Sequence, residues 1–210
     1  MLCYVTDRHA LQAAAGGSRS AALVERIRRA AEAGVDWVQL REKDLDARPL
    51  FDLAVAAGAA VRSSGSGTRI LINDRLDVAW AAGAAGVHLG EASLPVREVA
   101  REKRRVGPSE FLVGVSRHSL EGALQAERDG ADYIFFGPVF ATPSKAAFGP
   151  AQGLERLAEV CSAVRIPVLA IGGITAANAA ASLNAGAAGL AGIRLFQEAP
   201  DLGALLAAIR

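Results

Sequence analysis

The chain has 210 residues, of which 51% are hydrophobic and only 5% aromatic, and its formal net charge is +1. This length suits one large domain, and the balanced charge argues against a general nucleic-acid or membrane-surface role. No apolar run approaches the roughly 20 residues needed to span a bilayer. Charges at Asp7 and Arg8 come too early for a signal peptide, and Cys3 and Cys161 fit no metal or redox spacing. We therefore expect a cytoplasmic protein without nucleic-acid or membrane partners.

The chain is predicted to contain eight buried strands. Four of them share one local pattern, in which a helix end, a glycine and a short turn lead into an apolar run. Glycine suits the turn because the residue after a helix often needs a positive φ. The other four are apolar runs that lie before or between these units. In chain order, the strands are expected within residues 2–7, 33–40, 69–74, 82–89, 111–116, 129–136, 166–173 and 185–192.

Helical patterns separate the strands. Residues 20–34 place Leu23, Ile27 and Ala30 on one apolar face, with Arg and Glu opposite. Ser119 and Thr175 are expected to cap the starts of two further helices, and residues 202–209 to form a closing helix. Strands that are apolar on both faces indicate a parallel sheet. Eight alternations favour a (β/α)₈ TIM barrel, in one domain over residues 1–210, rather than an open sheet.

A barrel of this kind carries its chemistry where the strands end. The predicted strand ends are rich in cations, amides and hydroxyls. In chain order they carry Gln39, Arg41 and Lys43; Asn73 and Asp74; His88, Gly90 and Glu91; Ser116 and His118; Thr142, Ser144 and Lys145; Gly172 and Gly173; and Ile193 and Arg194.

These groups predict two phosphate-type sites. Arg41, Lys43 and Lys145 suit a polyanion such as pyrophosphate. The backbone N–H groups at Gly172–Gly173, just before a helix start, suit a second phosphate. Asp74 lies beside the cations and suits Mg²⁺, which takes one or two carboxylates plus substrate phosphates.

Each feature also has a plainer interpretation. Residues 39–43 could be a solvated charge run, and Asn73–Asp74 could only cap the next helix. His88, inside an apolar strand, is expected to be a satisfied interior histidine rather than a catalyst. Gly172–Gly173 could serve close packing alone. The hypothesis depends on several strand ends converging.

With these residues assembled, the chain resembles the thiamine-phosphate synthase family, which also includes the thiazole tautomerases. The resemblance runs from about Tyr4 to Phe196. The motifs that carry it lie at residues 38–44, 72–75, 86–90, 114–116, 136–145 and 170–174.

The resemblance implies that a hydroxymethylpyrimidine diphosphate is joined to a thiazole phosphate in a Mg²⁺-dependent, dissociative reaction that releases diphosphate. Position in the motifs assigns each residue an expected role. Arg41, Lys43, Asn73 and Lys145 would bind diphosphate; Asp74 would bind Mg²⁺; Gln39 and Ser116 would contact the pyrimidine; and Thr142, Ser144, Gly173 and Ile193 would border the thiazole phosphate. Gly172 and Arg194 are further candidates for substrate binding.

Two departures from the family pattern keep alternatives open. Ser93 stands where synthases usually carry a second Mg²⁺-binding Asp, with Glu91 as a substitute candidate, and Arg194 stands where a serine is usual. The missing carboxylate raises the metal-independent tautomerase as an alternative, and a sensor of thiamine precursors is a third. Asn73, Asp74 and Lys145 together favour the synthase. The sequence also allows a homo-oligomer.

Overall fold

Eight parallel strands pair in chain order and close into a barrel in the computed structural model, which describes residues 1–12, 16–142 and 150–210. The predicted TIM barrel is therefore confirmed. The strands are β1 (Leu2–Val5), β2 (Trp37–Leu40), β3 (Arg69–Asn73), β4 (Gly86–Leu89), β5 (Leu112–Arg117), β6 (Tyr133–Phe136), β7 (Val168–Ile171) and β8 (Gly189–Gly192).

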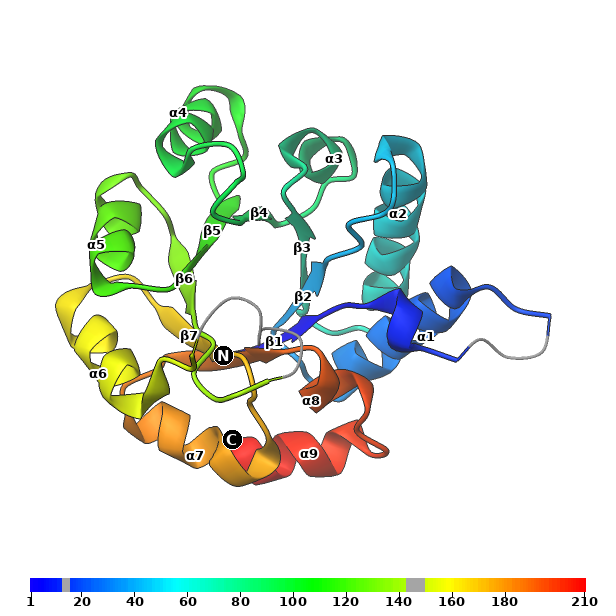
Figure 1. Ribbon diagram of the computed structural model, residues 1–210. Helices are drawn as coiled ribbons and strands as arrows, with labels where there is room; N and C mark the ends of the chain where they lie inside the picture. Colours follow the sequence, from blue (N-terminus) through cyan, green and yellow to red (C-terminus); the bar gives the residue numbers. More distant parts are fainter. Residues whose placement is uncertain (13–15, 143–149) are drawn as a thin grey trace.

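Helices surround the ring of strands (Figure 1). Their apolar faces pack on the outer side of the strands in one large hydrophobic core. No helix in the described ranges is long and apolar enough to cross a membrane. The helices are η1 (Arg8–Ala10), α1 (Arg19–Glu32), α2 (Ala47–Ser63), α3 (Leu76–Ala81), α4 (Val96–Val106), α5 (Leu120–Arg128), α6 (Gly153–Ala163), α7 (Ala176–Asn184), α8 (Arg194–Gln197) and α9 (Leu202–Ile209).

The predicted helix ends are largely confirmed. Ser119 and Thr175 cap α5 and α7 through their side chains, and α9 spans the expected residues. The four glycines predicted to follow helices all have a positive φ, between 64° and 97°. The strand expected within residues 166–173 is limited to β7, and the short helix α8 was not predicted.

A second, smaller core fills the inside of the barrel. Cys3, Val5, Leu71, Tyr133 and Phe135 are among its members. Because side chains alternate along a strand, positions two residues further on also face inward. These inward positions near the strand ends hold polar residues and form the mouth of the barrel: Gln39, Asn73, His88 and Ser116.

Candidate active site at the mouth of the barrel

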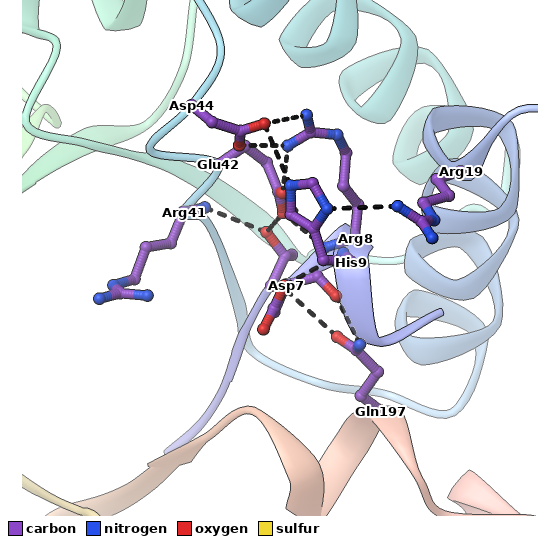
Figure 2. Close-up of polar contacts among 9 residues, drawn as sticks. Asp7, Arg8, His9, Arg19, Arg41, Glu42, Asp44 and Gln197 are labelled. Carbon is purple, nitrogen blue, oxygen red and sulfur yellow. Dashed lines mark hydrogen bonds and ion pairs between the residues drawn. The ribbon is translucent and has the colours of Figure 1, made fainter. Parts of the chain in front are cut away.

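The chain just after β2 places Arg41 and Glu42 on opposite sides of the barrel wall. Figure 2 shows the Arg41 side chain extending away from Glu42 and Asp44. The half-buried Arg41 lies close enough to His88, inside the barrel, for its positive charge to help lower the pKa of that imidazole, after burial itself. Arg41 is therefore on the mouth side, as predicted, while Lys43 is exposed.

Glu42 instead faces a cluster outside the strands (Figure 2). The residue is only 4% exposed, and its carboxylate accepts hydrogen bonds from the Thr6 hydroxyl (2.6 Å) and from the backbone and guanidinium of Arg8 (3.0–3.2 Å). The backbone N–H of Arg41 donates to the same Thr6 oxygen (3.0 Å). Asp44 completes the cluster on Arg8, whose guanidinium holds the pKa of the Asp44 carboxyl well below its usual range. The interpretation as a solvated charge run is therefore wrong.

The end of β3 forms a hydrogen-bonded chain with Gln39. The amide of Gln39 donates to the Asn73 side-chain carbonyl (2.9 Å), and the Asn73 amide donates to one Asp74 oxygen (2.9 Å). The other Asp74 oxygen accepts from the Ser93 hydroxyl and from the Gly90 N–H (3.3 Å). The structure thus brings predicted diphosphate-, metal- and pyrimidine-binding residues into one connected group.

Asp74 has a φ of 61°, in the left-handed region that non-glycine residues rarely adopt. The capping hypothesis for Asn73–Asp74 is wrong, because α3 begins after Arg75 and neither the Asn73 nor the Asp74 side chain caps it. The backbone bend at Asp74 instead accompanies a carboxylate that contacts Asn73, Gly90 and Ser93 across two strands.

Ser93, rather than Glu91, contacts Asp74. Glu91 is exposed, and its charge acts on Arg117, whose pKa is lowered by burial and partly restored by Glu91. Over the described ranges, no three His, Cys, Asp or Glu side chains gather in a way that would hold a metal ion. A cation at Asp74 would therefore depend on this one carboxylate, the Ser93 hydroxyl and oxygens of the ligand itself.

His88, on β4, contacts side chains of β5 and β6. Its Nε2 is 2.9 Å from the Ser116 hydroxyl and its Nδ1 is 3.0 Å from the Tyr133 hydroxyl, while the Phe135 ring lies at 4.1 Å between centroids. Burial, helped by the positive charges of Arg41 and Arg117, lowers the pKa of the His88 imidazole to about 3. The prediction of a satisfied interior histidine is confirmed, and this histidine contacts the predicted ligand residue Ser116.

The opposite side of the mouth holds the described residues among those predicted for the second phosphate. The Arg194 guanidinium donates to the Thr142 hydroxyl (3.2 Å), which links the start of α8 to the segment after β6. Ile193 packs on the interior core. Ser144 and Lys145 lie outside the described residues.

Gly172 and Gly173 make close contact with the segment after β6. Their φ values are 92° and 69°, and a Cβ on Gly172 would come within 2.6 Å of the Pro138 backbone. On Gly173 it would lie 2.7 Å from the Cβ of Phe140. Close packing, the plainer interpretation, is therefore supported, and phosphate binding at these two residues remains a prediction.

Comparison with known proteins identifies the family. A family model described as thiamine monophosphate synthase matches residues 2–196. The chain belongs to the thiamine monophosphate synthase family. Relatives named thiamine-phosphate synthase include one from Methanocella arvoryzae, 47% identical over 90% of this chain and 86% of the relative, and one from Roseiflexus castenholzii, 44% identical over 94% and 81%.

A solved thiamine phosphate pyrophosphorylase from Pyrococcus furiosus superposes on the whole of this chain with a TM-score of 0.83. It is 32% identical, and the match covers 93% of its own chain. The resemblance drawn from the motifs is therefore confirmed.

Three residues that support the site were not predicted from the sequence. Thr6 and Arg8 bind Glu42 on the outer side of β2, and the Tyr133 hydroxyl is hydrogen-bonded to His88 inside the barrel. Thr6 and Arg8 follow β1, where a search of strand ends on both faces would have found them. Tyr133 had no local signal. Its place depends on strand pairing, because Gly114 on the neighbouring β5 has no side chain and a Cβ there would lie 1.9 Å from the Tyr133 ring.

Proposed function

We propose that this protein is a thiamine-phosphate synthase that joins a hydroxymethylpyrimidine diphosphate to a thiazole phosphate and releases diphosphate. Family membership and the full-length structural match support the reaction. The observation that carries the site assignment is the Gln39–Asn73–Asp74 series of hydrogen bonds, which begins on β2 two residues before Arg41 and so on the same face of the strand.

The reaction needs no proton transfer at the bond that forms. The bond between the pyrimidine methylene carbon and the diphosphate oxygen breaks, and its electron pair leaves with the diphosphate. The thiazole nitrogen then supplies the electron pair of the new C–N bond. The enzyme's main task is to stabilise the negative charge that develops on the leaving group, which preset cations do well in a site that excludes water.

We assign this task to Arg41, Lys43, Asn73 and Lys145. Arg41 supports the assignment because it is half-buried, and within the described ranges no carboxylate pairs with its guanidinium. Its backbone is held by Thr6, so the side chain begins from a fixed point. Asn73 keeps its amide oriented by Asp74. A pre-oriented site of this kind avoids reorganisation during the reaction.

Mg²⁺ is proposed as the cofactor, held by Asp74 with Ser93 beside it. The donor set fits, because Mg²⁺ takes hard oxygen ligands and commonly uses one or two carboxylates together with substrate phosphates and waters. When bound, the ion would neutralise charge on the diphosphate. The Ser93 hydroxyl donates to Asp74 and accepts from the Gly90 N–H (2.6 Å), which leaves one lone pair for a cation. Glu91 has no such contact with Asp74.

The thiazole phosphate is assigned to the opposite side, at Thr142, Ser144, Gly172, Gly173, Ile193 and Arg194. The Arg194–Thr142 hydrogen bond supports this, because it places a guanidinium and a hydroxyl together beside the glycine pair. Arg194 would contribute positive charge where a serine is usual in this family. Guanidinium groups bind phosphate oxygens through paired N–H donors.

One paired assay tests the proposal. Purified protein is given both phosphorylated halves with Mg²⁺, and a parallel sample receives the thiazole carboxylate phosphate that a tautomerase would isomerise. We expect thiamine phosphate and diphosphate in the first sample only, and near-complete loss in the Asp74→Ala variant. Turnover of the thiazole carboxylate without synthase product would reject the proposal in favour of the tautomerase.

The remaining assignments follow from the same proposal. The partners are the two small phosphorylated substrates, and the chain acts as one barrel domain over residues 1–210. Cys3 and Cys161 are free thiols, which suits the reducing cytoplasm. Light scattering of the purified protein would decide whether it forms a homo-oligomer.

A further inference from the structure

Tyr133, His88 and Ser116 form a buried chain of hydrogen bonds that runs from the barrel interior to the mouth. Tyr133 is fully buried among Trp37, Phe135 and His88, with ring centroids 4.7–5.5 Å apart. Ser116, at the other end, is only partly buried and faces the mouth. The direction in which this chain donates decides whether the Ser116 hydroxyl offers a proton or a lone pair to a ligand.

The Tyr133 hydroxyl sets that direction. Burial raises the pKa of the Tyr133 phenol well above its usual value, so the group keeps its proton. Over the described part of the chain, His88 Nδ1 is the hydrogen-bond partner of this hydroxyl. A buried hydroxyl that failed to donate would carry the full cost of desolvation, so Tyr133 donates to Nδ1. His88 is then neutral, with its proton on Nε2.

The Nε2–H of His88 therefore donates to the Ser116 oxygen, 2.9 Å away. A hydroxyl that accepts from a neighbour keeps its own proton for another partner. No acceptor for that proton is found among the residues that the structure describes. Ser116 thus presents an O–H donor to whatever occupies the mouth.

A second series of hydrogen bonds determines which group Gln39 offers to a ligand. The Asp74 carboxylate can only accept, so the Asn73 NH₂ must face it and the Asn73 carbonyl must face Gln39. Gln39 therefore donates one N–H to Asn73. Its carbonyl oxygen, for which the described residues supply no donor, is the acceptor that Gln39 offers to a ligand. The amide orientations follow from the charge of Asp74 rather than from the positions of nearly equivalent atoms.

The geometry points to Tyr133 as a specificity-determining positioning residue, which acts through His88 to make Ser116 a hydrogen-bond donor that is matched with the Gln39 acceptor. A donor and an acceptor on one arc of the mouth, from β2 to β5, complement a heteroaromatic edge with a ring nitrogen next to an amino group. This inference rests on the proposed function, in which Gln39 and Ser116 contact the aminopyrimidine. It adds which edge of the pyrimidine ring the site recognises and which residue sets that specificity.

The imidazole tautomer can be tested without any substrate. Protein with ¹⁵N-labelled histidine is studied by NMR near pH 7, with His9 and His118 assigned by replacing each with Gln. We expect His88 to be the neutral Nε2–H tautomer, and the Tyr133→Phe variant to populate the Nδ1–H tautomer. An Nδ1–H tautomer in the unmodified protein would overturn the inference, whether or not the protein proves to be a synthase.

Ligand selectivity provides the second test. The probes are an aminopyrimidine without its diphosphate and the matching pyrimidinone, which exchanges donor and acceptor on the same edge. We expect calorimetry to show that the unmodified protein prefers the aminopyrimidine by about tenfold or more, since one mispaired hydrogen bond costs that much. The preference should fall severalfold in Tyr133→Phe, with no further change in Tyr133→Phe/Ser116→Ala relative to Ser116→Ala.

Tyr4→Phe is the matched control. Tyr4 is equally buried, and its hydroxyl donates to Gln197 (2.9 Å) on the outer side of β1. It should lose stability as Tyr133→Phe does and keep the full preference. Equal loss of preference in both variants, or none in Tyr133→Phe, would overturn the role of Tyr133. If the protein lacked synthase activity but kept the aminopyrimidine preference and the expected tautomer, the proposed function would fail and this inference would stand.

Discussion

The two faces of the barrel wall at the mouth use polar residues in different ways. On the outer face, Glu42 and Asp44 are bound by Arg8, and the charges neutralise one another. On the inner face, Arg41 has no carboxylate partner among the described residues, and the hydrogen-bond chains through His88 and Asn73 end in groups that still have a free donor or acceptor. The outer face is satisfied within the protein, whereas the inner face keeps the groups that we propose bind the ligand.

This difference shows how one strand serves two purposes. Because consecutive side chains point to opposite faces, Gln39 and Arg41 face the site while Leu40 and Glu42 face the helices. The buried Glu42 would be costly without its hydrogen bonds, and those bonds hold the backbone from which Arg41 extends. A one-residue shift of register would exchange the two sets.

The largest expected effect is on the inner face. Arg41→Gln should lower kcat/KM for the pyrimidine diphosphate by about 100-fold or more, because it removes a fixed charge from the leaving group. Steady-state kinetics would measure this. Arg48→Gln is the control, since Arg48 is an exposed arginine on α2 that pairs with Asp52. Comparable losses in both variants would contradict a specific role for Arg41.

The outer face is tested by stability. Glu42→Gln should lower the free energy of unfolding by about 3 kcal/mol, because it leaves the Arg8 guanidinium without its buried partner. Asp44→Asn changes the exposed partner of the same arginine and should have a much smaller effect. Urea unfolding would measure both. If Asp44→Asn proved the more damaging, the outer face would not depend on the buried Glu42–Arg8 pair.

His88 should make stability depend on pH. Its pKa falls from 6.5 to about 3 in the folded protein, so below pH 6.5 the unfolded chain takes up a proton that the folded chain does not. Stability is therefore complete above about pH 6.5 and falls by up to about 1.4 kcal/mol per pH unit below it.

Urea unfolding between pH 7 and pH 5 would measure this dependence, by comparison with His88→Asn. Carboxyl groups titrate mainly below this window, and the difference between the two proteins removes the contributions of His9 and His118. The variant should show the shallower profile. Parallel profiles would mean that His88 is not held neutral.

The smallest expected effect concerns Ser93. Ser93→Asp places a second carboxylate beside Asp74, which should lower the Mg²⁺ concentration for half-maximal activity by about tenfold. Without Mg²⁺ the two like charges should lower the melting temperature, and Mg²⁺ should restore it. Ala92→Asp adds the same charge at the neighbouring exposed position. An equal response in that variant would argue against a metal at Asp74.

Much of the fold was predictable because its signals are local. Apolar runs, four of them preceded by a glycine turn, predicted all eight strands, and side-chain capping by Ser119 and Thr175 predicted two helix starts. The charge run after β2 was harder to interpret, since its pattern does not say which acid has a partner. Glu42 finds that partner 34 residues away, in Arg8. Tyr133 reaches His88 across 45 residues.

Residue order alone decided which side chains stand at the strand ends and which of them share a face, since alternation along a strand is a property of the local backbone. Barrel closure decided the rest. It brought β1 beside β2, so that Thr6 and Arg8 meet Glu42, and β6 beside β5, so that Tyr133 fills the space left by Gly114 and reaches His88. Contacts between strands depend on register and stagger around the whole ring, which no single segment contains.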